Sequence, residues 1–139
     1  MPKLSSSQDA MRRYAAEADF QVAEALADRI ANVRHLREHH LWEILRTLPS
    51  LAEARDDTGF RHLFRVLMER DDLAAASQAL VEAARPACRI DRLDCIDGNW
   101  IARILSDGPV RRAVAVHCDR VAAVMAALVT LNRPGSLKH

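Results

Sequence analysis

The stretch PVRRAVAVHCDRVAAVMAALVTL, residues 109–131, carries the clearest structural signal in the chain. It follows Asp107-Gly108, which supplies a helix-capping aspartate just before a proline, and it ends shortly before the helix-breaking pair Pro134-Gly135. At 100° per residue, one side of this stretch is apolar, and the opposite side carries alanine and valine rather than charge. The pattern predicts a helix over 109–131 that is buried on nearly all sides and lies at the centre of the fold.

Helical periodicity also dominates the sequence before this stretch. An apolar stripe predicts a long helix over 8–36, and the spacing of Leu41, Trp42, Leu45 and Leu48 predicts another that ends at Pro49. The spacing leaves open whether residues 8–48 form one helix or two. Shorter helices are expected at 50–56, 60–70, 73–85 and 100–105.

Residues 87–99 are the least regular segment, and their aspartates are interpreted as helix caps and as partners of Arg89 and Arg92. No alternating run of β-branched residues stands out, so no strand is expected. The predicted fold class is all-α, a compact bundle of about six or seven helices around a central C-terminal helix. A chain of 139 residues fits one domain, which we place at 8–134, with flexible tails at 1–7 and 135–139.

Composition narrows the range of partners and compartments. The net charge of +1 gives no reason to expect an anionic membrane surface as a partner. The longest apolar run, 121–129, is far shorter than the ~20 residues of a membrane span, and no secretory signal is recognised at the N-terminus. Three cysteines without such a signal predict free thiols in a reducing cytoplasm. The excess of arginine and alanine is typical of a bacterial genome rich in G and C.

Four histidines are candidates for a metal or small-ligand site in a helical bundle. His35 and His39 are four residues apart, so a helix would place both on one face, and His62 and His117 could complete a site from other helices. Bundle metal centres also need several carboxylates in Glu-x-x-His motifs, which the sequence lacks. We therefore expect no metal and no cofactor, and this site remains a third hypothesis.

Nucleic-acid binding is the second hypothesis, because basic residues occur in clusters. Arg12-Arg13, the group Arg29, Arg34 and Arg37, and Arg111-Arg112 could contact phosphates. Acidic residues accompany each cluster, and aromatic residues make up only 4% of the chain, so platforms for base stacking are scarce.

The favoured hypothesis is a non-enzymatic interaction module, a small adaptor, chaperone-like or regulatory protein that forms a homodimer. No glycine-rich phosphate loop, nucleophile elbow or metalloprotease motif is present, so an enzyme is not expected. The two long predicted helices are apolar on more than one side, and such a surface requires a partner. The predicted contact residues are Phe20, Trp42 and Arg46. A helix break near residue 38 would instead place Trp42 at the border of the core.

Overall fold

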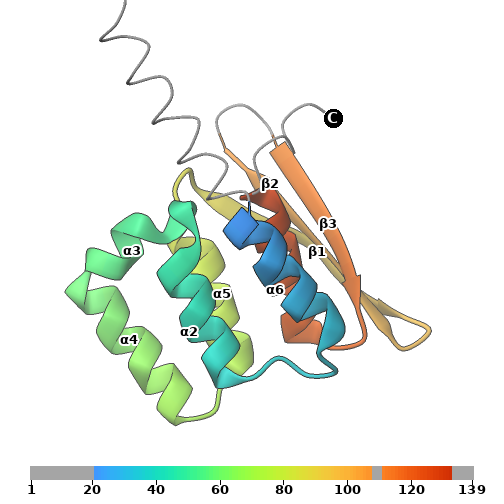
Figure 1. Cartoon of the computed structure of the whole chain (residues 1–139), viewed down its shortest axis with the longest axis horizontal. Helices are drawn as coiled ribbons and strands as arrows, with labels where there is room; N and C mark the ends of the chain where they lie inside the picture. The colour runs from blue at the N-terminus through green and yellow to red at the C-terminus, as the bar shows by residue number, and fades with distance from the viewer. Residues whose placement is uncertain (1–20, 108–110, 133–139) are drawn as a thin grey trace, which may run out of the picture.

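The protein combines helices with a β-sheet, as the computed structural model shows for residues 21–107 and 111–132. Residues 21–32 are helical. They are followed by α2 (Glu38–Thr47), the 3-10 turn η1 (Pro49–Leu51), α3 (Ala52–Asp56), α4 (Thr58–Glu69), α5 (Leu73–Ala83), β1 (Cys88–Ile96), β2 (Asn99–Ser106), β3 (Arg111–His117) and α6 (Arg120–Leu131). Figure 1 shows the helices gathered on one side of the strands. The prediction of an all-α helical bundle is therefore wrong.

The predicted central helix over 109–131 divides into a strand and a shorter helix. Within β3, Ala113 and His117 are buried whereas Val114 and Val116 are exposed, which is the two-residue period of a strand. A run of alanine and valine satisfies both the helical and the strand period, so the sequence pattern alone did not separate them. The true helix start is Asp119, whose carboxylate accepts a hydrogen bond from the backbone N–H of Ala122.

The segment expected to be irregular, 87–99, forms β1 and a tight hairpin turn, and the expected helix 100–105 is part of β2. Asp97 and Gly98 both have positive φ, 52° and 81°. Such a turn matches the right-handed twist of the two strands it joins. Asp-Gly between apolar residues is a strong hairpin signal, so the interpretation of Asp97 as a helix cap is wrong.

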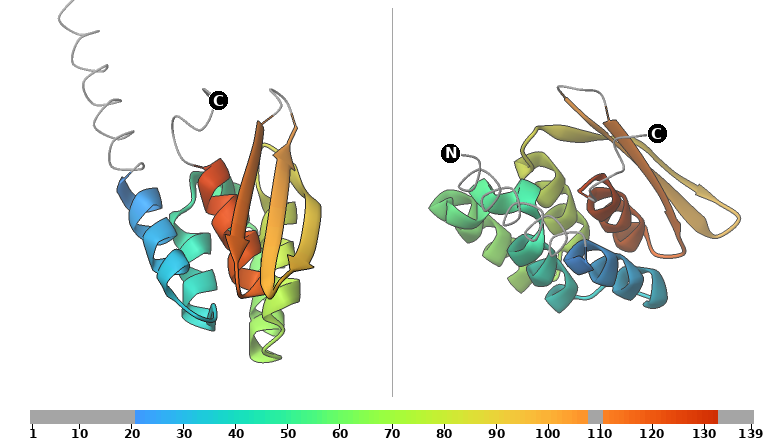
Figure 2. Two further views of the ribbon diagram at one scale, coloured as in Figure 1. Left: turned by 90° about the vertical axis from the view of Figure 1, so that its right-hand side faces the viewer. Right: turned by 45° about the horizontal axis from the view of Figure 1, so that its top comes forward.

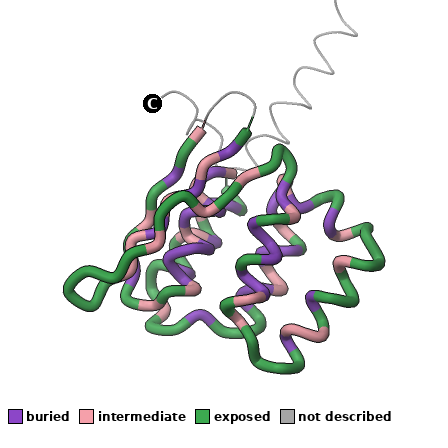
Figure 3. Tube along the Cα trace, turned by 180° about the vertical axis from the view of Figure 1, so that it is seen from behind, coloured by how far each residue is buried: buried purple, intermediate pink, exposed green. Residues whose placement is uncertain are grey.

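The three strands form an antiparallel meander in the order β1-β2-β3, and helices cover only one of its faces. The helices α5 and α6 pack against that face (Figure 2, left), and buried residues concentrate where they meet the strands (Figure 3). The side chains that fill this layer are mainly small or branched: Ala102, Ile104, Ala113, Val124, Met125 and Leu128. In the part of the chain that the structure describes, no element lies over the opposite face.

The predictions for the first half of the chain agree better with the structure. Helices occur close to the expected ranges 41–48, 60–70 and 73–85. The first helix ends at residue 32, and residues 33–37 are not helical, so 8–48 is not one continuous helix. The predicted tails lie outside the described residues. Within 21–107 and 111–132, every helix is too short or too polar to cross a membrane.

The hairpin turn gives a first test of this fold. We predict that Gly98→Ala lowers the free energy of unfolding by about 1–2 kcal/mol, because a side chain is strained at positive φ even where space is available. Gly59→Ala in α4 is the control: its backbone is helical, but the new methyl group lies 3.3 Å from Oδ1 of Asp57, so the gain in helix propensity and this close contact oppose each other and the net change stays below about 1 kcal/mol. Urea denaturation of both variants measures the difference. Equal effects would contradict the hairpin.

Candidate functional site

The uncovered side of the sheet is the candidate site, and we call it the open face. Its side chains come from alternate positions on the three strands, as the register and the exposure of the strands require. The open face comprises Arg89, Arg92 and Asp94 of β1, Ile101, Arg103 and Leu105 of β2, and Arg112, Val114 and Val116 of β3.

Large apolar side chains reach solvent on the open face. Val114 is 52% exposed and Val116 is 61% exposed. Val116 lies directly opposite Ile101 in the pairing of β2 with β3. Ile96, 48% exposed, ends β1 near the same corner of the sheet. The solvent side of an antiparallel sheet normally carries polar residues, so these side chains make an exposed apolar patch on the open face.

Ion pairs hold most of the charged residues of this surface. The register of β1 shifts between Ile90 and Arg92, and this irregularity presents Asp91 to the guanidinium of Arg103. Within β1, Nε of Arg92 lies 2.6 Å from Oδ2 of Asp94. These pairs are at the protein surface, so they contribute little to stability. Their main effect is to lower the net charge beside the apolar residues.

Charge is distributed unevenly along the strands of the open face. Asp94 lies across from Ile101, at the end of the sheet near the hairpin turn. Arg89 and Arg112 both lie across from Leu105, at the other end. One end of the open face, near the hairpin turn, therefore carries the acidic Asp94, and the other end carries the basic Arg89 and Arg112. An apolar residue of β2 lies at each end, Ile101 beside Asp94 and Leu105 between the two arginines.

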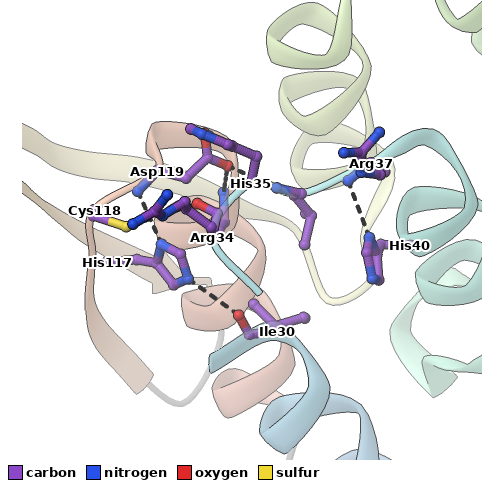
Figure 4. Close-up of polar contacts among 10 residues, drawn as sticks. Ile30, Arg34, His35, Arg37, His40, His117, Cys118 and Asp119 are labelled. Atoms are coloured by element: carbon purple, nitrogen blue, oxygen red, sulfur yellow. Dashed lines mark hydrogen bonds and ion pairs between the residues drawn. The ribbon is translucent and has the colours of Figure 1, made fainter. Parts of the chain in front are cut away.

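The four predicted histidine ligands do not form a metal site. His35 and His117 both contact Asp119 (Figure 4), whereas His39 and His62 are exposed on α2 and α4. Across 21–107 and 111–132, no group of three His, Cys, Asp or Glu side chains is close enough to hold a metal ion.

His117 links the sheet to the first helix. Its Nδ1 accepts a hydrogen bond from the backbone N–H of Asp119 at 2.9 Å, and its Nε2 lies 3.1 Å from the carbonyl oxygen of Ile30. Because that carbonyl can only accept, these two contacts assign the hydrogen to Nε2. Both ring nitrogens of this buried side chain are occupied, which is the arrangement of a structural histidine.

Asp119 joins the segment 33–37 to the start of α6. Its Oδ2 accepts hydrogen bonds from the backbone N–H groups of Ala122, at 3.0 Å, and of Leu36, at 3.1 Å. Its Oδ1 lies 3.7 Å from Nδ1 of His35. One carboxylate thus caps a helix and fixes a connection 83 residues away in the sequence.

Because residues 33–37 separate two helices, the predicted contact residues do not share one continuous helix. Trp42 is half-buried on α2, and its ring meets the edge of the Phe64 ring with centroids 4.8 Å apart. Arg46 is exposed on the same helix. Phe20 lies outside the described residues. Trp42 therefore borders the core, which was the outcome expected for two separate helices.

The arginine clusters are divided by the fold. Arg29 forms an ion pair with Glu43. Arg111 lies on the covered side of β3 and donates from Nη2 to the carbonyl oxygen of Leu131 at 2.5 Å, whereas Arg112 is exposed on the open face. The cluster Arg12-Arg13 lies outside the described residues. The sequence suggested continuous basic patches because it does not show which side of a strand each residue faces.

Comparison of the chain with protein-family models, with curated proteins and with solved structures found no match. Sequence reasoning missed the open face because it missed the strands, although the Asp97-Gly98 turn and the alternation of Val114 and Val116 could have revealed both.

The role of Asp119 can be measured against a simpler helix cap. We predict that Asp119→Ala lowers the free energy of unfolding by about 2–3 kcal/mol, because it removes the cap of α6 and leaves the Leu36 N–H without its acceptor. Asp72→Ala is the matched control, since Asp72 caps α5 by a hydrogen bond to the Ala75 N–H, and its loss costs about 1 kcal/mol. Equal losses in urea denaturation would show that the contact with Leu36 contributes nothing.

His40 makes stability depend on pH. It is buried, its Nδ1 accepts the backbone N–H of Arg37 at 3.0 Å, and burial followed by repulsion from His39 lowers its pKa below 6.5. As the pH falls below 6.5, the imidazole of His40 takes up a proton more readily in the unfolded chain than in the folded chain, because its pKa is lower in the folded chain. The free energy of unfolding therefore falls as the pH falls.

We predict that lowering the pH from about 7.5 to about 5 destabilises His40→Asn less than it destabilises the unmodified protein. The asparagine keeps an acceptor for the Arg37 N–H but does not titrate. His62→Asn removes an exposed histidine and is the control, with the pH dependence of the parent. Thermal unfolding across this range tests the assignment. A pH profile of His40→Asn identical to that of the parent would reject it.

Proposed function

We propose that the protein is a non-enzymatic interaction module that forms a homodimer through its open face. The observation that carries this proposal is the exposure of Val114 and Val116, 52% and 61%, on a sheet face without a covering layer among the described residues. Exposed apolar area is costly in water at roughly 25 cal/mol per Å². A second surface laid against these valines recovers that free energy.

A second copy of the chain is the occupant that the charge pattern favours. The two open faces can stack through a two-fold axis that lies in the plane of the interface and runs perpendicular to the strands. Each strand then faces the same strand of the partner, running in the opposite direction. This orientation places Asp94 opposite the partner's Arg89 and Ile101 opposite the partner's Leu105.

The two ends of the open face are complementary in this orientation, whereas the middle row, Arg92, Arg103 and Val114, lies opposite its own copy. Arg92 and Arg103 are each paired with an aspartate of their own chain, which limits their repulsion across the interface.

The size of the open face predicts a dimer of modest affinity. Three strands about 4.8 Å apart, with about eight residues each at about 3.4 Å, make a surface of about 14 by 27 Å. A footprint of about 380 Å² is roughly half of the about 800 Å² per partner in a standard interface, and it falls in the range of weak, transient contacts. We therefore propose a dimer that dissociates on dilution, as suits an adaptor, chaperone-like or regulatory protein that also contacts other proteins.

The other hypotheses have less support. The hypothesis of nucleic-acid binding is weakened because Arg29 is paired with Glu43 and because Arg111 and Arg112 face opposite sides of the sheet, so they do not form one basic patch. A metal site at the histidines would need ligands from separate parts of the fold. For the compartment we retain the cytoplasm, because Cys95 and Cys118 are exposed free thiols, which suit a reducing environment.

The dimer can be tested with charge on the open face. We predict that the parent protein shows a dimer fraction that rises with concentration in sedimentation equilibrium, and that Val114→Lys/Val116→Lys stays monomeric, because paired lysines repel across the interface. Leu63→Lys is the control, since Leu63 is 50% exposed on α4, and it should dimerise like the parent.

Circular dichroism of each variant verifies that the fold is retained. A parent protein that is monomeric at every concentration would reject the proposed function. A dimer disrupted by Leu63→Lys but not by the double lysine variant would reject the open face as its interface.

A further inference from the structure

A cavity on the helical side of the sheet is separate from the open face. It has a volume of about 210 Å³ and lies where η1, the end of α5, the edge of the sheet and the end of α6 meet. Pockets for drug-sized ligands measure about 300–1,000 Å³, so this one suits a small molecule. Its described lining consists of Pro49, Ser50, Ala84, Arg85, Pro86, Cys88, Ser106, Arg111, Leu128, Leu131 and Asn132.

Two hydroxyl groups in this lining lack a protein partner. Ser106 is only 7% exposed, and its Oγ has no hydrogen-bond partner within the described residues. The Oγ of Ser50 is also inaccessible to solvent and without a partner there. A buried hydroxyl without a hydrogen bond costs about 1–3 kcal/mol. These two hydroxyls are hydrogen-bonding groups that a molecule bound in the cavity can engage.

Positive charge surrounds these hydroxyls. Arg85 and Arg111 both line the cavity, and none of the described lining residues is acidic. Outside the lining, Oε2 of Glu53 lies 3.7 Å from Nε of Arg85, so this carboxylate partly offsets the charge of Arg85. Contacts to backbone carbonyls position the two guanidinium groups, since Arg111 donates to Leu131 at 2.5 Å and Arg85 donates to Ala84 at 2.8 Å. A guanidinium carries five N–H donors, so it can contact a carbonyl oxygen and an anion at the same time.

Cys88 adds no negative charge to the lining. Its thiol donates to the carbonyl oxygen of Val81 at 3.3 Å. Burial and the nearby Asp107 raise its pKa to about 11, so the thiol is neutral at physiological pH. The cavity therefore presents donors and positive charge on one part of its wall, and proline and leucine side chains on another.

We propose that this cavity binds a small carboxylate with a short apolar body. The guanidinium groups and the hydroxyls of Ser50 and Ser106 hold the carboxylate, and Pro49, Leu128 and Leu131 contact the body. This site is independent of the dimer, because it lies on the opposite side of the sheet.

Benzoate is the probe, with neutral benzamide and inorganic phosphate for comparison, each titrated into the full chain by calorimetry. We expect benzoate to bind more tightly than either, because only benzoate combines the charge with the apolar body. Ser106→Ala should weaken benzoate about tenfold, the loss expected for one hydrogen bond to a charged group. Ser77→Ala is the control, because Ser77 is also buried but donates to the Ala74 carbonyl, and it should bind benzoate like the parent.

Thermal unfolding with and without benzoate gives a second readout, which Ser50→Ala extends to the other hydroxyl. The parent midpoint should rise with benzoate, and the rise should shrink in both Ser106→Ala and Ser50→Ala. Absence of benzoate binding, phosphate binding as tight as that of benzoate, or equal binding to Ser106→Ala and the parent would each overturn the proposal.

Discussion

The carboxylate of Asp119 and the imidazole of His117 fix the point at which the sheet, α6 and the first helix meet. His117 contacts the end of the 21–32 helix through Ile30, and Asp119 holds both Leu36 and the first turn of α6. The contacts with Ile30 and Leu36 join positions more than 80 residues apart in the sequence. Because buried polar groups are costly without partners, this arrangement is strongly specified once the chain is compact.

A three-stranded sheet with helices on one side divides the molecule into two unlike surfaces. The covered side is filled mainly by alanine, isoleucine and leucine. Polar residues on this side, such as His117 and Ser106, make specific contacts or line a cavity. The other side consists of ion pairs and exposed valine. Strand alternation alone separates these sets, because neighbouring residues such as Arg111 and Arg112 point in opposite directions. The two proposed binding surfaces therefore share no residues.

Sequence reasoning located the helices of the first half correctly, because leucine and aromatic residues there follow a helical spacing bounded by proline and paired aspartates. It failed between residues 87 and 119. Alanine and valine alternate in β3, but a run of these residues also fits a buried helix. The helical interpretation of 109–131 therefore hid the two-residue period of the strand. The cavity was not predictable at all, because Ser50, Ser106 and Arg111 are distant in sequence and carry no shared motif.

The sequence by itself determined the helical spacing of α2, α4 and α5, the boundaries set by proline and paired aspartates, and an apolar content sufficient for a core. These follow from local periodicity and backbone preferences, which act within a few residues. Only the tertiary structure decided that residues 88–96, 99–106 and 111–117 pair as strands, which side of the sheet is covered, and where unpartnered hydroxyls gather. Strand pairing depends on hydrogen bonds between segments apart in the chain, and burial depends on what packs above each face, so neither is encoded in a single local pattern.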